Sequence, residues 1–210
     1  MIAGVEEAGR GPVIGPLVMA LVETDTQTIK KLEELGVTDS KLLSPKRREL
    51  LYTKIKELCE VKVIILSPEK IDNALNSPTM NLNWLEAKTS STLINKSKAR
   101  KVILDCPSNN FETYANYVKK NLTRQVELVV EHKADSKYTI VGAASIIAKV
   151  IRDREIEKLK IVANFDFGSG YPSDPRTIAF IKDNWNKYDF FRKTWSTYKK
   201  LSQKSLGDFN

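Results

Sequence analysis

The first twelve residues constrain the fold of this chain more than any other segment. A short apolar run at residues 2–5 indicates a β-strand, and two adjacent acids, Glu6 and Glu7, follow it directly. Carboxylates at the end of a strand can hold a divalent cation. The next turn, Gly9-Arg10-Gly11, lets backbone amides and a guanidinium approach a phosphate or a sugar closely. The segment therefore indicates metal-dependent chemistry on a phosphodiester, although a strand followed by a charged glycine turn also occurs without such chemistry.

Composition limits the class of protein. A chain of 210 residues can bury one sizeable core, and a net charge of +8 with a pI of about 9.3 favours a polyanionic partner. No apolar run approaches the roughly 20 residues that cross a bilayer, and the N-terminus lacks the pattern of a signal peptide. Cys59 and Cys106 are far apart, which fits a reducing compartment. We therefore expect a cytoplasmic protein with no membrane segment, and we expect it to be a monomer.

Apolar runs alternate with helical patterns in an order that predicts an α/β fold. Strands are expected at residues 2–5, 13–22, 61–66, 101–104 and 125–130. Helices are expected at residues 26–35, 45–58, 81–94, 111–120 and 138–160, with a further helix start at 67–69. Three adjoining strands followed by strands that alternate with helices predict a mixed five-stranded sheet flanked by helices.

Four acids stand at or just beyond the ends of these strands: Glu6, Glu7, Asp105 and Asp135. If the first, fourth and fifth strands are parallel neighbours, the four carboxylates converge on one edge of the sheet. Such carboxylates repel one another unless cations neutralise them. Two Mg²⁺ or Mn²⁺ ions about 4 Å apart would do so and would activate water against a phosphodiester. Each acid taken alone could equally be a solvated loop charge.

The motifs around these acids resemble ribonuclease HII of the archaeal branch, in the correct order and over essentially the whole chain. The matching motifs are Gly4-Val5-Glu6-Glu7-Ala8-Gly9-Arg10-Gly11-Pro12, Asp39-Ser40-Lys41, Leu104-Asp105, Lys133-Ala134-Asp135, Gly142-Ala143-Ala144-Ser145-Ile146-Ile147-Ala148-Lys149 and Gly168-Ser169-Gly170-Tyr171-Pro172-Ser173-Asp174-Pro175. The resemblance implies a ribonuclease H-like catalytic domain at residues 1–165, a helical extension at 166–202 and a tail at 203–210.

The resemblance also implies an activity and roles for individual residues. The expected activity is endonucleolytic cleavage of RNA in RNA–DNA hybrids and of ribonucleotides embedded in duplex DNA, leaving 5′-phosphate and 3′-hydroxyl ends. The acids Glu6, Glu7, Asp105 and Asp135 are expected to bind the two metal ions. Gly9, Arg10 and Gly11 are expected to contact the ribonucleotide, Tyr171 to pack on its sugar and sense the 2′-hydroxyl, and Lys41 to contact a nearby phosphate.

One residue departs from the family pattern. The family has aspartate where this chain has Glu6, and that acid is expected to bridge both metal ions. The extra methylene moves the carboxylate by more than about 1 Å, in a kind of site that tolerates about 0.5 Å. Either the neighbouring backbone compensates, or the chain is a weakened enzyme that binds hybrids on the same scaffold. A third possibility is another two-metal nuclease, such as an integrase-like strand-transfer enzyme. The Gly-Arg-Gly turn and Tyr171 argue against it, because neither would have a role on a substrate of DNA alone.

The C-terminal segment is basic and aromatic. Its aromatic residues are interpreted as packing, and its cations are expected to follow a DNA strand: Arg192, Lys193, Lys199 and Lys200. The final residues resemble a sliding-clamp-binding box with anchors Gln203, Leu206 and Phe209, although the second aromatic of that box is replaced by Asn210. A frayed terminus is the alternative interpretation of this tail.

Overall fold

The computed structural model describes residues 1–207, which form two compact units. Unit 1 comprises residues 1–8, 18–64 and 82–151, and unit 2 comprises residues 9–17, 65–81 and the described residues from 152 onward. The boundaries at 165/166 and 202/203 that the sequence suggests stay predictions. In the described chain, no helix is both long enough and apolar enough to cross a membrane.

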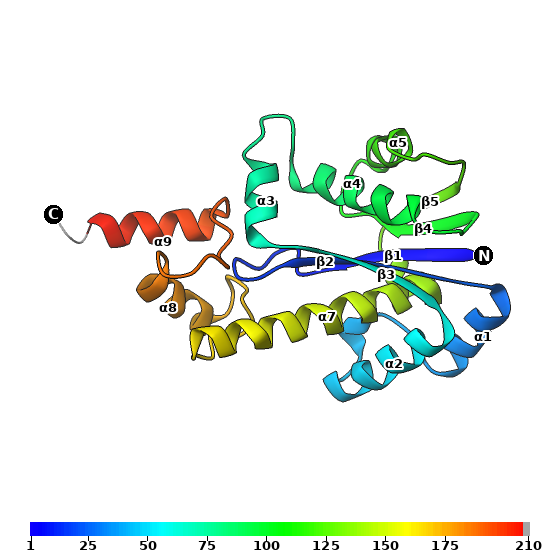
Figure 1. Cartoon of the computed structure of the whole chain (residues 1–210), viewed down its shortest axis with the longest axis horizontal. Coiled ribbons are helices and arrows are strands. Elements are labelled where there is room, and N and C mark those ends of the chain that lie inside the picture. The colour runs from blue at the N-terminus through cyan, green and yellow to red at the C-terminus, as the bar shows by residue number, and fades with distance from the viewer. Residues whose placement is uncertain (208–210) are drawn as a thin grey trace. The chain divides into compact units, whose positions relative to one another are not determined.

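A five-stranded mixed sheet confirms the predicted fold class (Figure 1). Its order is β3-β2-β1-β4-β5, where β1 is Ile2–Ala8, β2 is Leu17–Thr24, β3 is Glu60–Leu66, β4 is Lys101–Asp105 and β5 is Glu127–Glu131. Strand β1 pairs antiparallel with β2 and parallel with β4, and β4 pairs parallel with β5. The first, fourth and fifth strands are therefore parallel neighbours, as the convergence of the acids requires.

Helices cover both faces of this sheet. In Figure 1, α1 (Thr26–Glu34), α2 (Pro45–Leu58) and α7 (Thr139–Ala163) lie on one face, and α4 (Leu82–Asn95) and α5 (Phe111–Lys120) lie on the other. The start of α2 follows from its sequence, because the Ser44 side chain accepts a hydrogen bond from the Arg47 amide and Pro45 occupies the first turn.

Small residues let α7 pack directly on the sheet. A Cβ atom at Gly4 of β1 would lie 2.4 Å from the carbonyl oxygen of Ile140, which no real side chain tolerates. The buried stretch 141–148 of α7 is rich in alanine and packs against Val18, Ala20 and Val22 of β2 in the core of unit 1. Glycine in the first motif is therefore needed for the close approach of helix and strand.

Unit 2 is built on aromatic packing. Its helices are α3 (Pro68–Leu75), α8 (Pro175–Asn184), α9 (Ser196–Gly207) and the part of α7 from residue 152. Its core holds five buried aromatic side chains: Phe167, Phe180, Phe190, Phe191 and Tyr198. Trp185, Tyr188 and Trp195 pack against this core, and Tyr198 is part of it, which confirms the interpretation of these four C-terminal aromatics as packing residues.

Three predicted elements differ from the observed ones. The strand expected at 13–22 begins only at Leu17. The backbone amides of Val13 and Ile14 bond to the Gly170 carbonyl in a loop instead of to a strand of the sheet, and both side chains are buried in the core of unit 2. Strand β1 continues through Glu6 and Glu7 to Ala8, because β2 pairs with it along its whole length. The helix expected from residue 138 is preceded by the short α6 (Ala134–Lys137), and an extended Tyr138 separates the two.

Candidate active site

The first two acids lie inside β1, beside the end of β4. Val5 is in register with Leu104, so the next residues of the two parallel strands, Glu6 and Asp105, lie at the same level. The Glu6 side chain is 5% exposed, and its Oε2 accepts a hydrogen bond from the Glu7 amide at 2.6 Å. Regular pairing on both sides of β1 therefore places a buried carboxylate among other acids.

This environment favours the protonated form of Glu6. Burial, followed by the negative charges of Glu7 and Asp105, raises the pKa of Glu6 well above its ordinary value. The hydrogen bond from the Glu7 amide opposes the rise but does not cancel it.

The other two acids are positioned by the turn after β5. Asp105 ends β4, and its Oδ1 accepts a hydrogen bond from the Ala134 amide at 2.7 Å. Burial and the charge of Asp135 raise the pKa of Asp105, although that amide bond opposes the rise. Asp135 lies in α6 and is buried, and Lys133 just before α6 has a left-handed φ of 56°. A non-glycine residue in that conformation is typical of turns that the surrounding structure holds in place.

Lys41 belongs to the same cluster. Asp39 accepts a hydrogen bond from the Lys41 amide at 2.9 Å, and the Ser40 and Ser145 hydroxyls are 2.8 Å apart, which fixes this turn on α7. The Lys41 Nζ lies 3.1 Å from Asp135 Oδ2. Burial opposes the charged ammonium, but the hydrogen bond and charge of Asp135 raise the pKa of Lys41 above its ordinary value.

The four acids lie close together, but their side chains are not arranged in the geometry that coordinates a metal ion. Among residues 1–207, no three His, Cys, Asp or Glu side chains are arranged to hold one ion. Glu6 Oε2 accepts a hydrogen bond from the Glu7 amide, and Asp135 Oδ2 accepts one from Lys41 Nζ. The donor set itself fits Mg²⁺ or Mn²⁺, since all four acids offer the carboxylate oxygens that these cations prefer as ligands.

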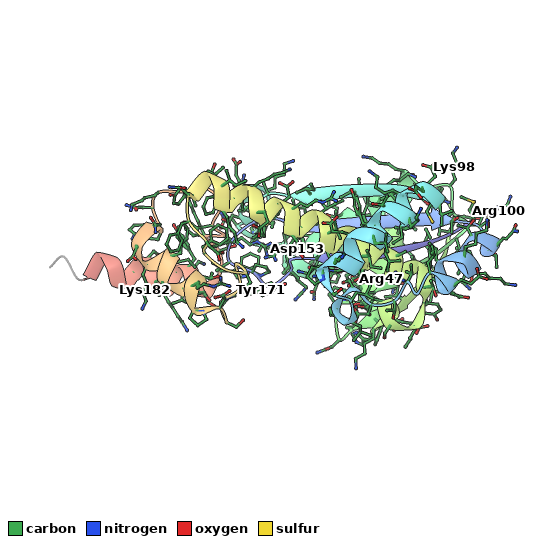
Figure 2. All side chains as sticks on the ribbon, turned by 90° about the horizontal axis from the view of Figure 1, so that it is seen from below. Arg47, Lys98, Arg100, Asp153, Tyr171 and Lys182 are labelled. Carbon is green, nitrogen blue, oxygen red and sulfur yellow. The ribbon has the colours of Figure 1, made fainter. Side chains whose placement is uncertain are left out.

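In unit 2 the glycine turn and Tyr171 are brought together, as expected for residues of one site. The Val13 amide donates to the Gly170 carbonyl at 2.9 Å, which joins the two loops. A Cβ atom at Gly11 would lie 3.4 Å from Tyr171 Cε1, so the ring rests against the turn. Tyr171, labelled in Figure 2, is 36% exposed. The Arg152 guanidinium lies 5.3 Å from its ring centroid.

Arg192 corrects one prediction. It was expected on the surface as a DNA-tracking cation, but its side chain is fully buried. Its guanidinium donates to three carbonyls, those of Gly9 at 2.6 Å, Arg10 at 2.9 Å and Gly15 at 2.9 Å. A buried guanidinium is stable only when its donors are satisfied, and here the curled turn supplies the acceptors. Lys193, Lys199 and Lys200 are exposed, so their predicted role is untouched.

Two positioning residues were missed by the sequence reasoning. The side chain of Asp174, the N-cap of α8, also accepts from the Ser169 amide at 2.8 Å, and this bond leads the effects that lower its pKa to about 2. The Arg152 Nη2 donates to the Ser169 carbonyl at 2.6 Å. An aspartate before Pro175 predicts a helix cap, but no local signal indicates that the cap also holds the loop before Tyr171.

The proposed clamp-binding residues lie at the end of the described chain. Gln203 is exposed on α9, and the helix continues past the expected boundary at 202/203, through Leu206, to Gly207. Phe209 lies outside the described residues.

Comparison with known proteins places these observations in a family. The family model described as Ribonuclease HII matches residues 3–198. A Ribonuclease HII from Methanococcus maripaludis strain C5 is 44% identical, and the alignment covers 96% of this chain and 87% of that protein. The crystal structure of ribonuclease H2 from Pyrococcus horikoshii OT3 is 41% identical with a TM-score of 0.88, over 98% of both chains. The RNase HII of the PCNA:RNase HII complex from Archaeoglobus fulgidus is 40% identical with a TM-score of 0.88, over 100% of both chains.

Replacing Glu6 by glutamine should stabilise the metal-free protein at neutral pH. The folded-state pKa of Glu6 lies above its ordinary value, so the metal-free chain loses stability as the pH rises through that folded pKa. Glu6→Gln carries no titrating charge there and should lack this loss. Thermal unfolding in a chelating buffer between pH 5 and pH 8 measures the difference, and the gap between the two proteins should widen with pH.

Glu23→Gln is the matched control, because Glu23 is 2% exposed and equally part of the sheet. Burial disfavours its charge, but the Lys62 ammonium and the amides of Lys98 and Ala99 compensate, and the pKa of Glu23 is lowered. Losing this paired charge should cost about 3 kcal/mol, or roughly 6–12 °C in Tm. A similar fall in Tm for Glu6→Gln would contradict the account of the cluster.

Proposed function

Because the chain belongs to the ribonuclease HII family and is an endoribonuclease, we propose that it cleaves the RNA strand of RNA–DNA hybrids and single ribonucleotides embedded in duplex DNA. The observation that carries this proposal is the cluster of Glu6, Glu7, Asp105 and Asp135, in which burial and then the charges of neighbouring acids raise the pKa of Glu6 and of Asp105. The family depends on divalent metal ions. We assign the four acids as their ligands, with Mg²⁺ or Mn²⁺ as the ion.

Bound at these acids, two such ions would supply an activated water and would stabilise the departing 3′-oxygen, which yields 5′-phosphate and 3′-hydroxyl ends. The residues of the chain prepare this arrangement. Asp105 is held in place by the Ala134 amide, which leaves its Oδ2 as the oxygen to offer to an ion. Glu6 would turn away from the Glu7 amide to reach an ion, and the positive charge of that ion would favour its ionised form. Lys41 leaves Asp135 and offers its ammonium to the phosphate beside the cleaved bond.

In unit 2, the turn of Gly9, Arg10 and Gly11 is assigned to the ribonucleotide. Arg192 takes the carbonyls of Gly9 and Arg10, and the Trp195 Nε1 donates to the Gly11 carbonyl at 3.2 Å. The turn is thus fixed before the substrate arrives, which lowers the entropic cost of positioning it. Tyr171, resting against Gly11, is assigned to the sugar that carries the 2′-hydroxyl, the group that distinguishes RNA from DNA.

A second function is a hybrid-binding protein with weakened catalysis. The longer side chain of Glu6, where the family is expected to carry aspartate, and the turn of that carboxylate onto the Glu7 amide favour it. Such a protein would keep the glycine turn and Tyr171.

Cleavage of a duplex with one embedded ribonucleotide separates these two functions. The enzyme should produce 5′-phosphate and 3′-hydroxyl ends only with Mg²⁺ or Mn²⁺. Glu6→Asp should raise the metal-dependent rate if side-chain length is the handicap, and should leave hybrid affinity unchanged. A 2′,3′-cyclic phosphate product, which requires no metal, would refute the mechanism. A fast native enzyme that is slowed by Glu6→Asp would show that the backbone is adapted to glutamate.

Tyr171→Ala should lower the rate of cleavage at an embedded ribonucleotide more than it lowers the affinity for the duplex. Loss of the ring misplaces the sugar, and misplacements near 1 Å can cost about 100-fold in rate. We expect a fall of that order in cleavage at the embedded ribonucleotide, with duplex affinity within about threefold of native. Tyr188→Ala, which removes an aromatic ring from the packing around Phe190, is the control for general loss of stability. Equal losses in rate and affinity for Tyr171→Ala would reduce Tyr171 to a general contact.

We also propose that the tail binds a sliding clamp through Gln203, Leu206 and Phe209. The Archaeoglobus fulgidus relative was solved in complex with PCNA, which supports the proposal. Calorimetric titration of the full chain with the clamp of its own organism should give a micromolar Kd, about −8 kcal/mol. Phe209→Ala should abolish the heat, whereas Lys187→Ala should not. An absence of heat from the native chain at high micromolar concentration would remove the partner.

Monomeric state and cytoplasmic location are further proposals. Cys59 and Cys106 are both free, and burial raises the pKa of Cys59 to about 11, which keeps its thiol protonated and unreactive. Two inert thiols are compatible with a reducing compartment.

A further inference from the structure

A shallow surface cavity, broadly open to solvent, lies at the end of unit 1 that is opposite to the acids. Its volume is about 950 Å³, and it opens where β4 and β5 begin. Arg100 precedes β4, whereas Asp105 ends that strand, so the two positions are about 16 Å apart along the strand at 3.3 Å per residue. Figure 2 shows Arg100 at this end, near Lys98. The lining is Arg100, Lys119, Leu122, Thr123, Arg124, Gln125, Val126 and Glu127.

Positive charge dominates this lining. Three cations, Arg100, Lys119 and Arg124, come from three different segments. The one acid among the lining residues is Glu127, and its Oε1 is already paired with Lys101 Nζ at 2.7 Å. Within the described part of the chain, Arg100 and Lys119 form no ion pair, and both are exposed. The cavity therefore offers cations that are available to an anion.

Arg124 adds a fixed positive charge to the wall. Its Nη1 donates to the Ala99 carbonyl at 2.7 Å, and its Nη2 donates to the Ile94 carbonyl and the Ser97 hydroxyl, both at 3.1 Å. All of these acceptors are neutral, and its buried Nε has no acceptor in the described structure. The bonds hold the guanidinium in place but do not neutralise it. An anion in the cavity would lower the energy of this charge.

We propose that this cavity binds the phosphates of a single nucleic-acid strand, at a site separate from the acids. Arg100 provides the planar fork that matches phosphate oxygens, and Lys119 provides a second, mobile charge. Thr123 and Gln125 are exposed hydrogen-bonding side chains, and Leu122 and Val126 offer apolar surface to a base. An acidic peptide would use the cations but would leave the apolar part of the lining unmatched.

The test compares two double variants that each remove two positive charges from unit 1. Arg100→Ala with Lys119→Ala empties the cavity of its exposed cations. Lys30→Ala with Lys31→Ala removes exposed charges from α1, on the other face of the sheet (Figure 1). Fluorescence anisotropy follows a labelled 12-nucleotide single-stranded DNA on the full chain, in a chelating buffer, between 50 and 300 mM salt. Because no cleavage takes place, the result is independent of the proposed catalytic function.

The cavity variant should raise the Kd at least tenfold over the native value. Its slope of log affinity against log salt should be shallower by about 1.4, since each lost phosphate contact on a single strand removes about 0.7. The α1 variant should change the Kd less than twofold and leave the slope unaltered. Equal effects of the two variants would overturn the proposal. Arg100→Gln with Lys119→Gln should repeat the loss, and melting curves identify any variant that fails to fold.

Competition identifies the source of the phosphate. An unlabelled oligonucleotide should displace the label, whereas ATP and inorganic phosphate should do so only at far higher concentration. If ATP displaces the label at concentrations comparable to the oligonucleotide, and does so only with the two cations present, the ligand is a free nucleotide and the strand is excluded. Equal displacement by poly-glutamate would show an unspecific anion surface, which also overturns the proposal.

Discussion

The burial of Glu6 among other carboxylates is the constraint on which the rest of unit 1 depends. The sheet holds this side chain beside Glu7 and Asp105, and burial with their charges raises its pKa. Repulsion between buried carboxylates destabilises the folded state unless protons or cations neutralise their charge, so these acids do not contribute to the stability of the fold. Lys41 supplies one positive charge at Asp135, and the remaining deficit is what a divalent cation would fill. The folded metal-free chain is thus less stable because of these acids, at the place where the catalytic chemistry is expected.

Close packing under the cluster fixes its geometry. Gly4 lets the start of α7 approach β1, and a Cβ atom at Gly142 would lie 3.1 Å from both the Asp135 carbonyl oxygen and the Thr38 backbone. The helix, the Lys41 turn and the segment that carries Asp135 therefore meet with no space for side chains. The charged groups are consequently held by rigid backbone rather than by flexible loops, which suits a site with small tolerance in position.

Much of this could be predicted from sequence, for identifiable reasons. Strand periodicity and the acids at strand ends depend on local patterns, and the sheet order confirmed that β1, β4 and β5 are neighbours. Arg192 was misplaced, because its three carbonyl partners come from a turn more than 170 residues earlier in the chain. Asp174 was missed as the anchor of the Ser169 amide, since a helix cap with a second partner has no local signature. The periodicity of apolar residues does not indicate which distant backbone groups a polar side chain will bind, so such contacts could not be predicted.

Because the pKa of Glu6 is raised in the metal-free chain, binding of a cation at this carboxylate should be coupled to the loss of a proton. Calorimetric titration of the metal-free chain with Mn²⁺ at pH 6, in two buffers of different ionisation enthalpy, counts the protons that binding releases. The account predicts a measurable release from the native chain and a smaller one from Glu6→Gln. Mn²⁺ binding with no proton release from the native chain would contradict it.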